Sequence, residues 1–268
     1  MANFVDNYCE YPTALRRPMW RIWHNLMLRF VKDSSVNFMN YGFSGLNGDD
    51  PIKLEKNDEI NRYCIQLYDH VASGITLENK KVVEVGSGRG GGAHYIARYH
   101  KPLKYTGVDI SPGVIKYCNS EYNVPGLSFV EGMAENIPLD TGSHDAVVNV
   151  ESARCYSDLN LFFKEVHRIL NAEGHFLFAD MIEKEEIEDM RKRLQSSGFT
   201  IFSEKEITKN VAKGLALDSK RRELLIDEKI PGILKKSFER FAGTEGTDRF
   251  NSFQNGKFEY WSFILTKN

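Results

Sequence analysis

The segment Val82–Gly92, which reads VVEVGSGRGGG, decides the fold of this chain. Its apolar half is typical of a buried strand, its second half is rich in glycine, and a helical pattern continues to Arg98. Glycines at such a junction let the backbone approach a ligand closely at the N-terminus of a helix, where N–H groups are unpaired. The segment therefore predicts a strand, a ligand-binding turn and a helix.

Strands and helices alternate on either side of this turn, from about residue 80 to residue 182. The strands are expected at Lys81–Val85, Tyr105–Ile110, Leu127–Val130, Ala146–Val150, His175–Met181, Phe199–Ser203 and, antiparallel at the end of the sheet, Tyr260–Thr266. Gly174 is expected to end the helix that precedes the fifth strand. Short apolar strands separated by helices indicate a parallel sheet covered on both faces. We therefore expect an α/β fold with a doubly wound, seven-stranded sheet.

The chain divides into four expected parts. These are an N-terminal helical lid (1–79), a cofactor-binding α/β core (80–206), a helical insertion that covers the substrate (207–242) and the closing strand (243–268). In the lid, Pro18–Phe30 has the apolar spacing of an amphipathic helix. In the insertion, the triplet Lys220–Arg222 is expected to lie on a solvated helix face.

Composition argues against several classes of protein. The 268 residues include 35 Lys and Arg against 37 Asp and Glu, so no basic surplus indicates nucleic acid or an anionic membrane as an obligatory partner. No window approaches about 18 apolar residues, and the N-terminal residues lack a signal-peptide core, so we expect a cytoplasmic protein. The four cysteines form no CxxC pair and the seven histidines no HxxxH or HxH pair. We therefore expect neither disulfides nor a metal.

The glycine pattern alone leaves two ligands open. Gly86, Gly88 and Gly91 also satisfy the G-x-G-x-x-G pattern of dinucleotide binding, and Asp109 could hold ribose hydroxyls in either case. Glu84 favours one of the two. A carboxylate there suits a ligand with an ammonium group, such as the methionine end of S-adenosylmethionine, and repels a pyrophosphate.

Together these segments resemble the class I S-adenosylmethionine-dependent methyltransferases. The resemblance rests on the E-x-G-x-G-x-G run that begins at Glu84, on Val108–Ile110, on Gly132–Leu139 and on Asp145–Glu151, in the family's order. It implies S-adenosylmethionine as methyl donor and S-adenosylhomocysteine as product.

A narrower resemblance is to the phthiotriolone and phenolphthiotriolone dimycocerosate O-methyltransferases, which methylate a hydroxyl on a long polyketide lipid. It is carried by Trp20 and Trp23, Glu84–Gly92, Pro125–Leu127, Asn149–Glu151, Cys155–Tyr156, Phe238 and Gly243–Thr244. Two positions depart from the family. Met133 stands where Asp is common in the adenine loop, and Arg154 stands where a His is expected as proton acceptor.

The resemblance implies a role for each matching residue. The donor site would comprise Glu84, Gly86, Ser87 and Gly88 at the methionine end, Asp109 at the ribose, Ile110, Met133, Ala134 and Glu135 around the adenine, Asn149 near the sulfur, and Tyr41 as a lid. Because an alcohol must lose its proton, a general base is expected, and Glu151 is the first candidate. A residue that only orients the substrate is the alternative reading of Glu151. Arg154 and Asp180 are further candidates, with loop-anchoring and capping as their alternatives.

We therefore expect a methyltransferase that O-methylates a hydroxyl of a hydrophobic small molecule or lipid-like polyketide. N- or C-methylation of a small metabolite is the alternative within the fold. Glu84 and the lack of a Tyr-x-x-x-Lys pair argue against an NAD-dependent dehydrogenase, and a binding module would hold the donor without turnover. The expected partner is the hydrophobic acceptor, with no nucleic acid, no obligatory membrane and no metal, and a homodimer is left open.

Overall fold

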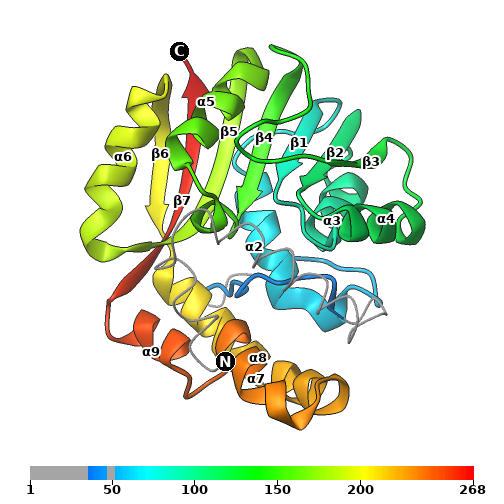
Figure 1. Ribbon diagram of the computed structural model, residues 1–268, viewed down its shortest axis with the longest axis vertical. Coiled ribbons are helices and arrows are strands. Elements are labelled where there is room, and N and C mark those ends of the chain that lie inside the picture. Colours follow the sequence, from blue (N-terminus) through cyan, green and yellow to red (C-terminus); the bar gives the residue numbers. More distant parts are fainter. Residues whose placement is uncertain (1–35, 47–51) are drawn as a thin grey trace.

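The computed structural model describes residues 36–46 and 52–268. The predicted helix Pro18–Phe30, with Trp20 and Trp23, lies outside the described residues. The described chain forms one seven-stranded sheet with helices on both faces and a group of helices at one end (Figure 1). The strand order is β3-β2-β1-β4-β5-β7-β6.

The strands occupy the regions that the sequence predicted. They are β1 (Lys81–Val85), β2 (Lys104–Asp109), β3 (Leu127–Glu131), β4 (His144–Val150), β5 (Leu170–Glu183), β6 (Phe199–Glu206) and β7 (Phe258–Lys267). The first five pair in parallel, whereas β7 pairs antiparallel with both β5 and β6. The last strand thus lies beside the edge strand β6 and not at the edge itself. The doubly wound α/β fold is confirmed.

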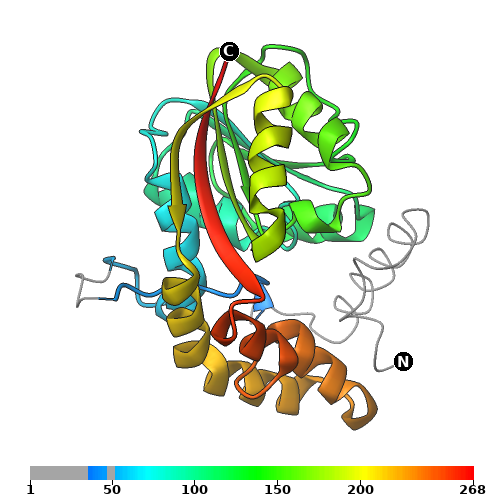
Figure 2. The same ribbon diagram turned by 90° about the vertical axis from the view of Figure 1, so that its left-hand side faces the viewer.

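Helices cover the two faces of the sheet (Figure 2). One face carries α2 (Arg62–Ala72), preceded by η3 (Glu59–Asn61), α3 (Gly91–Tyr99) and α4 (Pro112–Glu121). The other carries α5 (Leu159–Ile169) and α6 (Ile187–Ser196), with the short turns η4 (Ala153–Cys155) and η5 (Lys184–Glu186). Alternate residues of β1 enter the two cores: Val82 packs on the α2 side and Val83 on the α5 side. This alternation fixes the side chain of Glu84 on the α2 side.

The end of α5 was predicted wrongly. The helix ends at Ile169, and Gly174 lies inside β5. The chain becomes extended at Leu170 because that residue already pairs with His144 at the start of β4. Gly174, which was predicted to end a helix, is therefore a strand residue. The pairing of β5 with β4 outweighs the tendency of glycine to end a helix.

The region before β7 also differs in detail from the expected insertion. It contains α7 (Thr208–Lys229), α8 (Gly232–Ala242) and a third helix, α9 (Asp248–Gln254), which the sequence did not predict because seven residues are too few for a periodic pattern. Pro231, which has no N–H to donate, separates α7 from α8. These three helices gather at the end of the sheet where β7 begins (Figure 1). Since β7 is antiparallel to β5, that end is where the parallel strands terminate. The division of the chain at residues 79, 206 and 242 stays a prediction.

The packing of α3 on α2 generates a stability prediction. A Cβ atom at Gly92 would lie 2.0 Å from Cε1 of Tyr68, on a ring that is almost fully buried. We expect Gly92→Ala to lower the free energy of unfolding by about 1–3 kcal/mol, although alanine favours helix over glycine. Gly232→Ala is the matched control, because a Cβ atom there meets nothing within 4 Å. Its effect should stay within about 0.5 kcal/mol in urea unfolding. Equal effects of the two substitutions would contradict the packing.

Candidate active site

The glycine turn after β1 adopts backbone conformations that only glycine accepts easily. Gly86 and Gly88 have φ angles of 76° and 50°. The N–H groups of Gly86 and Ser87 both donate to the carbonyl of Val108, at 2.8 and 3.0 Å, which ties the turn to β2. A Cβ atom on Gly86 would lie 2.4 Å from Oγ of Ser152. The turn therefore presents bare backbone at the N-terminus of α3, as predicted for a cofactor site.

Asp109 lies at the end of β2 and is directly bonded to this turn. Its Oδ2 accepts from the N–H of Gly88 at 3.0 Å, and its Oδ1 accepts from the N–H of Ser111 at 2.9 Å. Ile110, half-buried, follows it. The structure thus places the predicted ribose carboxylate against the glycine turn, and its contact with ribose stays a prediction.

Glu84 is fully buried between two tyrosines. Its carboxyl oxygens accept from the hydroxyls of Tyr68, at 2.8 Å, and Tyr105, at 3.1 Å. Burial raises the pKa of Glu84 to about 8, although the two hydrogen bonds oppose the rise. A bound ammonium group would favour the charged form and lower this pKa. The predicted contact with the donor's ammonium group stays a prediction.

Asn149 and Ser87 offer unused polar atoms beside the turn. Nδ2 of Asn149 donates to the carbonyl of Val85 at 2.8 Å and lies within 2.9 Å of the hydroxyls of Ser152 and Tyr156. Its Oδ1 and the Oγ of Ser87 are buried and have no hydrogen-bond partner among the described residues. Buried polar atoms are seldom left unpaired, so such atoms indicate a place for a polar ligand. The residues present therefore fit a ligand with an ammonium group.

The expected adenine loop follows β3. Ala134 is buried in the same apolar cluster as Val108, and Met133 forms a local bridge with Asn136. Glu135 accepts hydrogen bonds from both the N–H and the hydroxyl of Ser157. Glu135 is thus directed toward the segment before α5, which leaves the Met133–Ala134 backbone as the better candidate for the adenine edge.

Glu151 lies just after β4 in a strained conformation. Its φ angle is 52°, which is rare for a residue with a side chain and typical of functional sites. Oε1 accepts from the N–H of Tyr41 at 2.8 Å and from the hydroxyl of Tyr260 at 3.0 Å. Burial raises the pKa of Glu151 to about 8, and the charge of Asp180 adds to the rise. The sequence did not single out Tyr260, because only β7 pairing brings it here.

Asp180 and Arg154 lie on the same side of the site. Oδ1 of Asp180 accepts from the N–H of Met181 at 2.7 Å, and Oδ2 accepts from the N–H of Arg154 at 3.3 Å. Burial raises the pKa of Asp180 to about 6, against the opposing charge of Arg154. The guanidinium of Arg154 lies 5.7 Å from the ring centre of Phe258. The structure therefore brings together the three predicted catalytic candidates, and their roles stay predictions.

A mainly apolar pocket lies between the segment before the core and helices α7 and α8. Its apolar lining includes Phe38, Met39, Ile226, Ile230, Phe238 and Phe241, and Arg221 and Arg222 also line it. A Cβ atom on Gly88 would lie 2.8 Å from Cε of Met39, so this one lining side chain also contacts the glycine turn.

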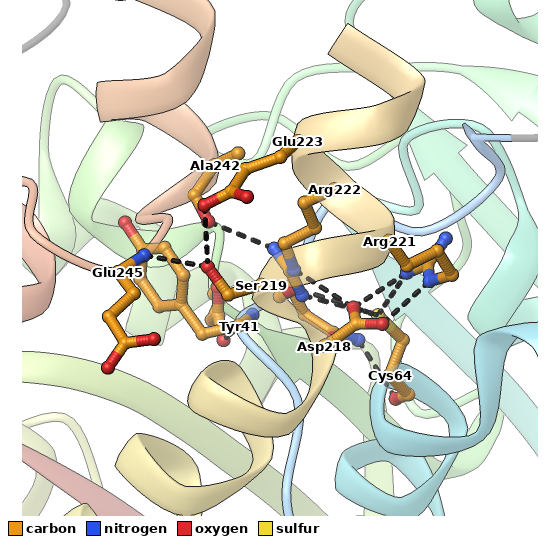
Figure 3. A network of polar contacts seen from close by, with 11 residues as sticks. Tyr41, Cys64, Asp218, Ser219, Arg221, Arg222, Glu223, Ala242 and Glu245 are labelled. Carbon is orange, nitrogen blue, oxygen red and sulfur yellow. Dashed lines mark hydrogen bonds and ion pairs between the residues drawn. The ribbon is translucent and has the colours of Figure 1, made fainter. Parts of the chain in front are cut away.

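A buried ion pair was missed by the sequence reading (Figure 3). Arg222 was expected in solvent, yet its Nε donates to Oδ2 of Asp218 at 2.9 Å, and both residues are buried. Its other nitrogens donate to the carbonyls of Asn40, at 2.8 Å, and Ala242, at 3.0 Å. The available signal was helical spacing, because positions 218 and 222 share a face with the buried Leu215.

In the part of the chain that the structure describes, no group of three or more His, Cys, Asp or Glu residues could hold a metal ion. No helix in the same part is long and apolar enough to cross a membrane.

Comparison with known proteins identifies the family. A family model for the methyltransferase domain matches residues 83–178. The phthiotriol/phenolphthiotriol dimycocerosates methyltransferase of Mycobacterium leprae is 33% identical over 259 residues, which covers 96% of this chain and 94% of the relative. The chain belongs to the phthiotriol/phenolphthiotriol dimycocerosates methyltransferase family. This methyltransferase is also 36% identical over 216 residues to a fatty-acid O-methyltransferase of Mycolicibacterium smegmatis, which covers 80% of this chain and 77% of the relative.

Solved structures agree on the fold. The geranyl diphosphate C-methyltransferase of Streptomyces coelicolor, in complex with Mg²⁺, geranyl diphosphate and S-adenosylhomocysteine, matches with a TM-score of 0.67. The alignment covers 96% of this chain and all of that one, at 15% identity, so it shows the fold alone. With the family established, this methyltransferase uses S-adenosylmethionine, and the dehydrogenase alternative falls away.

The buried ion pair generates a second stability prediction. We expect Arg222→Met to lower the free energy of unfolding by about 2–4 kcal/mol, because Asp218 loses one of its two charged partners inside the protein. Arg221 remains in contact with Asp218 in this variant. Arg193→Met is the matched control, since Arg193 and Asp189 form an i,i+4 pair that is exposed. Its expected cost in urea unfolding is about 0.5 kcal/mol or less. A loss for Arg222→Met no larger than the control's would show that the buried pair contributes nothing.

Proposed function

We propose that this methyltransferase transfers the methyl group of S-adenosylmethionine to a hydroxyl oxygen of a lipid-like acceptor, with Glu151 as the general base. One observation carries the proposal. Both hydrogen bonds to the Glu151 carboxyl group end on Oε1, which leaves Oε2, in the described part of the chain, able to accept a proton. Glu151 directly follows β4, on the sheet edge that also holds the glycine turn.

The residues at the glycine turn hold the donor. Asp109 accepts the ribose hydroxyls, while Oδ1 of Asn149 and the Glu84 carboxyl group face the ammonium end. The backbone of Met133 and Ala134 meets the adenine, and Ile110 packs on its face. Bound donor supplies a methyl group on a positively charged sulfur, which is already activated. The protein therefore has to orient the acceptor, exclude water and remove one proton.

The raised pKa of Glu151 suits that last task. A base with a pKa near 8 retains enough basicity to take a proton from an alcohol as the methyl group transfers. The N–H of Tyr41 and the hydroxyl of Tyr260 fix the carboxyl group in one orientation. Tyr41, which belongs to the segment that precedes the α/β core, thereby covers Glu151 from that side of the site.

The acceptor class is supported by the apolar pocket and by the relatives. Phe238 and Met39 line an apolar pocket, and Met39 also contacts the glycine turn at Gly88, so this pocket is the proposed place for apolar groups of the acceptor. The names of the relatives refer to phthiotriol dimycocerosates and to fatty acids. Both support a lipid-like acceptor. The position of Glu151 supports a hydroxyl as the methylated group, since an alcohol must lose a proton when it is methylated.

Loss of the base should abolish most activity. We expect Glu151→Gln to lower kcat by about 10²–10⁴-fold, as for other general bases. In the wild type, kcat/KM for the donor, which reports the free enzyme, should rise with pH through about 8 and then level off, because only ionised Glu151 accepts a proton. Activity is measured as methyl transfer from labelled donor to lipid extract. Glu173→Gln, at an exposed site, is the control. A flat pH profile together with full activity of Glu151→Gln would exclude Glu151 as the base.

Donor affinity should depend on Asp109. We expect Asp109→Ala to weaken S-adenosylmethionine binding roughly tenfold or more in calorimetry, because charged hydrogen bonds contribute about 1.5–3 kcal/mol each. Glu131→Ala is the matched control, since Glu131 also ends a strand at this sheet edge but is exposed. Because Asp109 also holds Gly88, the thermal unfolding of both variants is compared. Unchanged affinity in a folded Asp109→Ala protein would rule out the ribose assignment.

A further inference from the structure

Arg249 lies near Gly243 and Tyr41 and forms no ion pair with an Asp or Glu among the described residues. It belongs to α9 and is half-buried. Its guanidinium lies 5.2 Å from the ring centre of Phe258, and Nη1 lies 3.6 Å from the sulfur of Met181. A thioether sulfur is a weak acceptor, and a guanidinium has five N–H groups to donate. Within the described ranges, this sulfur is the one hydrogen-bond acceptor of the Arg249 side chain.

Seven other arginines of the described chain form ion pairs with Asp or Glu: Arg62, Arg98, Arg168, Arg191, Arg193, Arg221 and Arg222. Arg154 shares the surroundings of Arg249, since its Nη1 lies 3.6 Å from the same Met181 sulfur and its guanidinium 5.7 Å from the centre of the same Phe258 ring. Arg249 is half-buried against an aromatic ring and a thioether, where a charge is less well solvated than at the surface. An anion at this place would therefore be bound more strongly than at an exposed arginine.

Arg249 is also close to the residues that hold the general base. The position of a Cβ atom on Gly243 is 3.1 Å from Cε1 of Tyr41 and 3.4 Å from Cγ of Arg249, so the two side chains flank the same point. The ring of Tyr41 packs edge-on against Phe253 of α9, with 5.5 Å between ring centres. The charge of Arg249 acts on Tyr41, where it opposes the rise in pKa that burial causes. Tyr41 in turn donates its N–H to Glu151.

We propose that Arg249 binds a carboxylate of the acceptor. Two parallel N–H groups of a guanidinium match the two oxygens of a carboxylate. The acceptor is then an acidic lipid whose carboxylate is anchored at Arg249 while its hydroxyl meets Glu151. This assignment rests on the proposed function for the place of the hydroxyl, but the binding of the carboxylate can be measured without turnover.

The test compares two ligands that differ in the charged group. Decanoate and decanol are titrated calorimetrically into the full-length protein with S-adenosylhomocysteine present. We expect decanoate to bind more tightly than decanol, and Arg249→Gln to weaken decanoate about tenfold or more while leaving decanol unchanged. Arg249→Lys should recover part of the loss, since it keeps the charge but not the paired N–H groups.

Lys257→Gln is the matched control. Lys257 is exposed, and its Nζ lies 5.4 Å from the ring centre of the same Phe258, so it tests the general effect of a nearby positive charge. It should change decanoate affinity less than about threefold. Thermal unfolding of each variant shows whether it is folded.

Three results would overturn the inference. Equal weakening of decanoate and decanol by Arg249→Gln would mean that the residue only shapes the pocket. Weaker binding of S-adenosylhomocysteine with unchanged decanoate binding would place the donor's carboxylate at Arg249. Tighter binding of decyl phosphate than of decanoate, lost in Arg249→Gln, would assign the residue to a phosphate. The proposed function is judged separately by mass spectrometry of the product: a methyl ester in place of a methyl ether would overturn hydroxyl methylation and leave the binding result intact.

Discussion

The active site depends on the hydrogen bond from the N–H of Tyr41 to Oε1 of Glu151. It joins the segment before the core to the end of β4, across 110 residues of sequence. The left-handed backbone of Glu151 costs about 1–3 kcal/mol, so surrounding contacts must hold it in place. The hydrogen bonds from Tyr41 and Tyr260 act on the side chain, and the bond from the N–H of Glu151 to the carbonyl of Ala179, at 2.9 Å, acts on the backbone. Without them the carboxyl group would have no defined direction.

The position of Tyr41 is secured by the buried charge pair of α7. Arg222 donates to the carbonyl of Asn40, directly before Tyr41, while Asp218 neutralises the arginine (Figure 3). The same guanidinium reaches the end of α8 through Ala242. A buried ion pair is weak evidence for stability in itself, but it fixes geometry because a displaced charge would be left unpaired. The helices between β6 and β7 are thereby linked to the segment that contains Tyr41 and, through it, to Glu151.

Three buried carboxyl groups give this site its electrostatic character. Burial raises the pKa values of Glu84 and Glu151 to about 8 and that of Asp180 to about 6. Near neutral pH, the first two are therefore mostly protonated and the third is mostly ionised. A positively charged sulfonium donor placed among them would shift Glu84 and Glu151 toward the charged form, which is the form that binds an ammonium group or accepts a proton. Binding of the donor and ionisation of Glu151 would be coupled in this way.

The sequence by itself determined the α/β fold, the glycine turn and the residues at the ends of β1, β2 and β4. These features depend on short-range pattern: apolar strands, glycines with positive φ, and acidic residues at fixed distances from them. The family likeness could be read from the same segments. Even so, Gly174 was assigned to a helix end, because the pairing of Leu170 with His144 is not visible in a local window.

Only the tertiary structure decided which distant side chains meet. Tyr260 reaches Glu151 because β7 inserts between β5 and β6, and Arg249 reaches Tyr41 because the short helix α9 folds back against the lid. Arg222, expected in solvent, is buried because α7 turns the face that carries Asp218 and Arg222 toward Asn40. Such contacts depend on the relative placement of whole elements, and each element's own sequence is compatible with many placements. Local pattern therefore predicted the glycine turn and the carboxyl groups beside it, whereas the contacts around Glu151 and Tyr41 required the assembled fold.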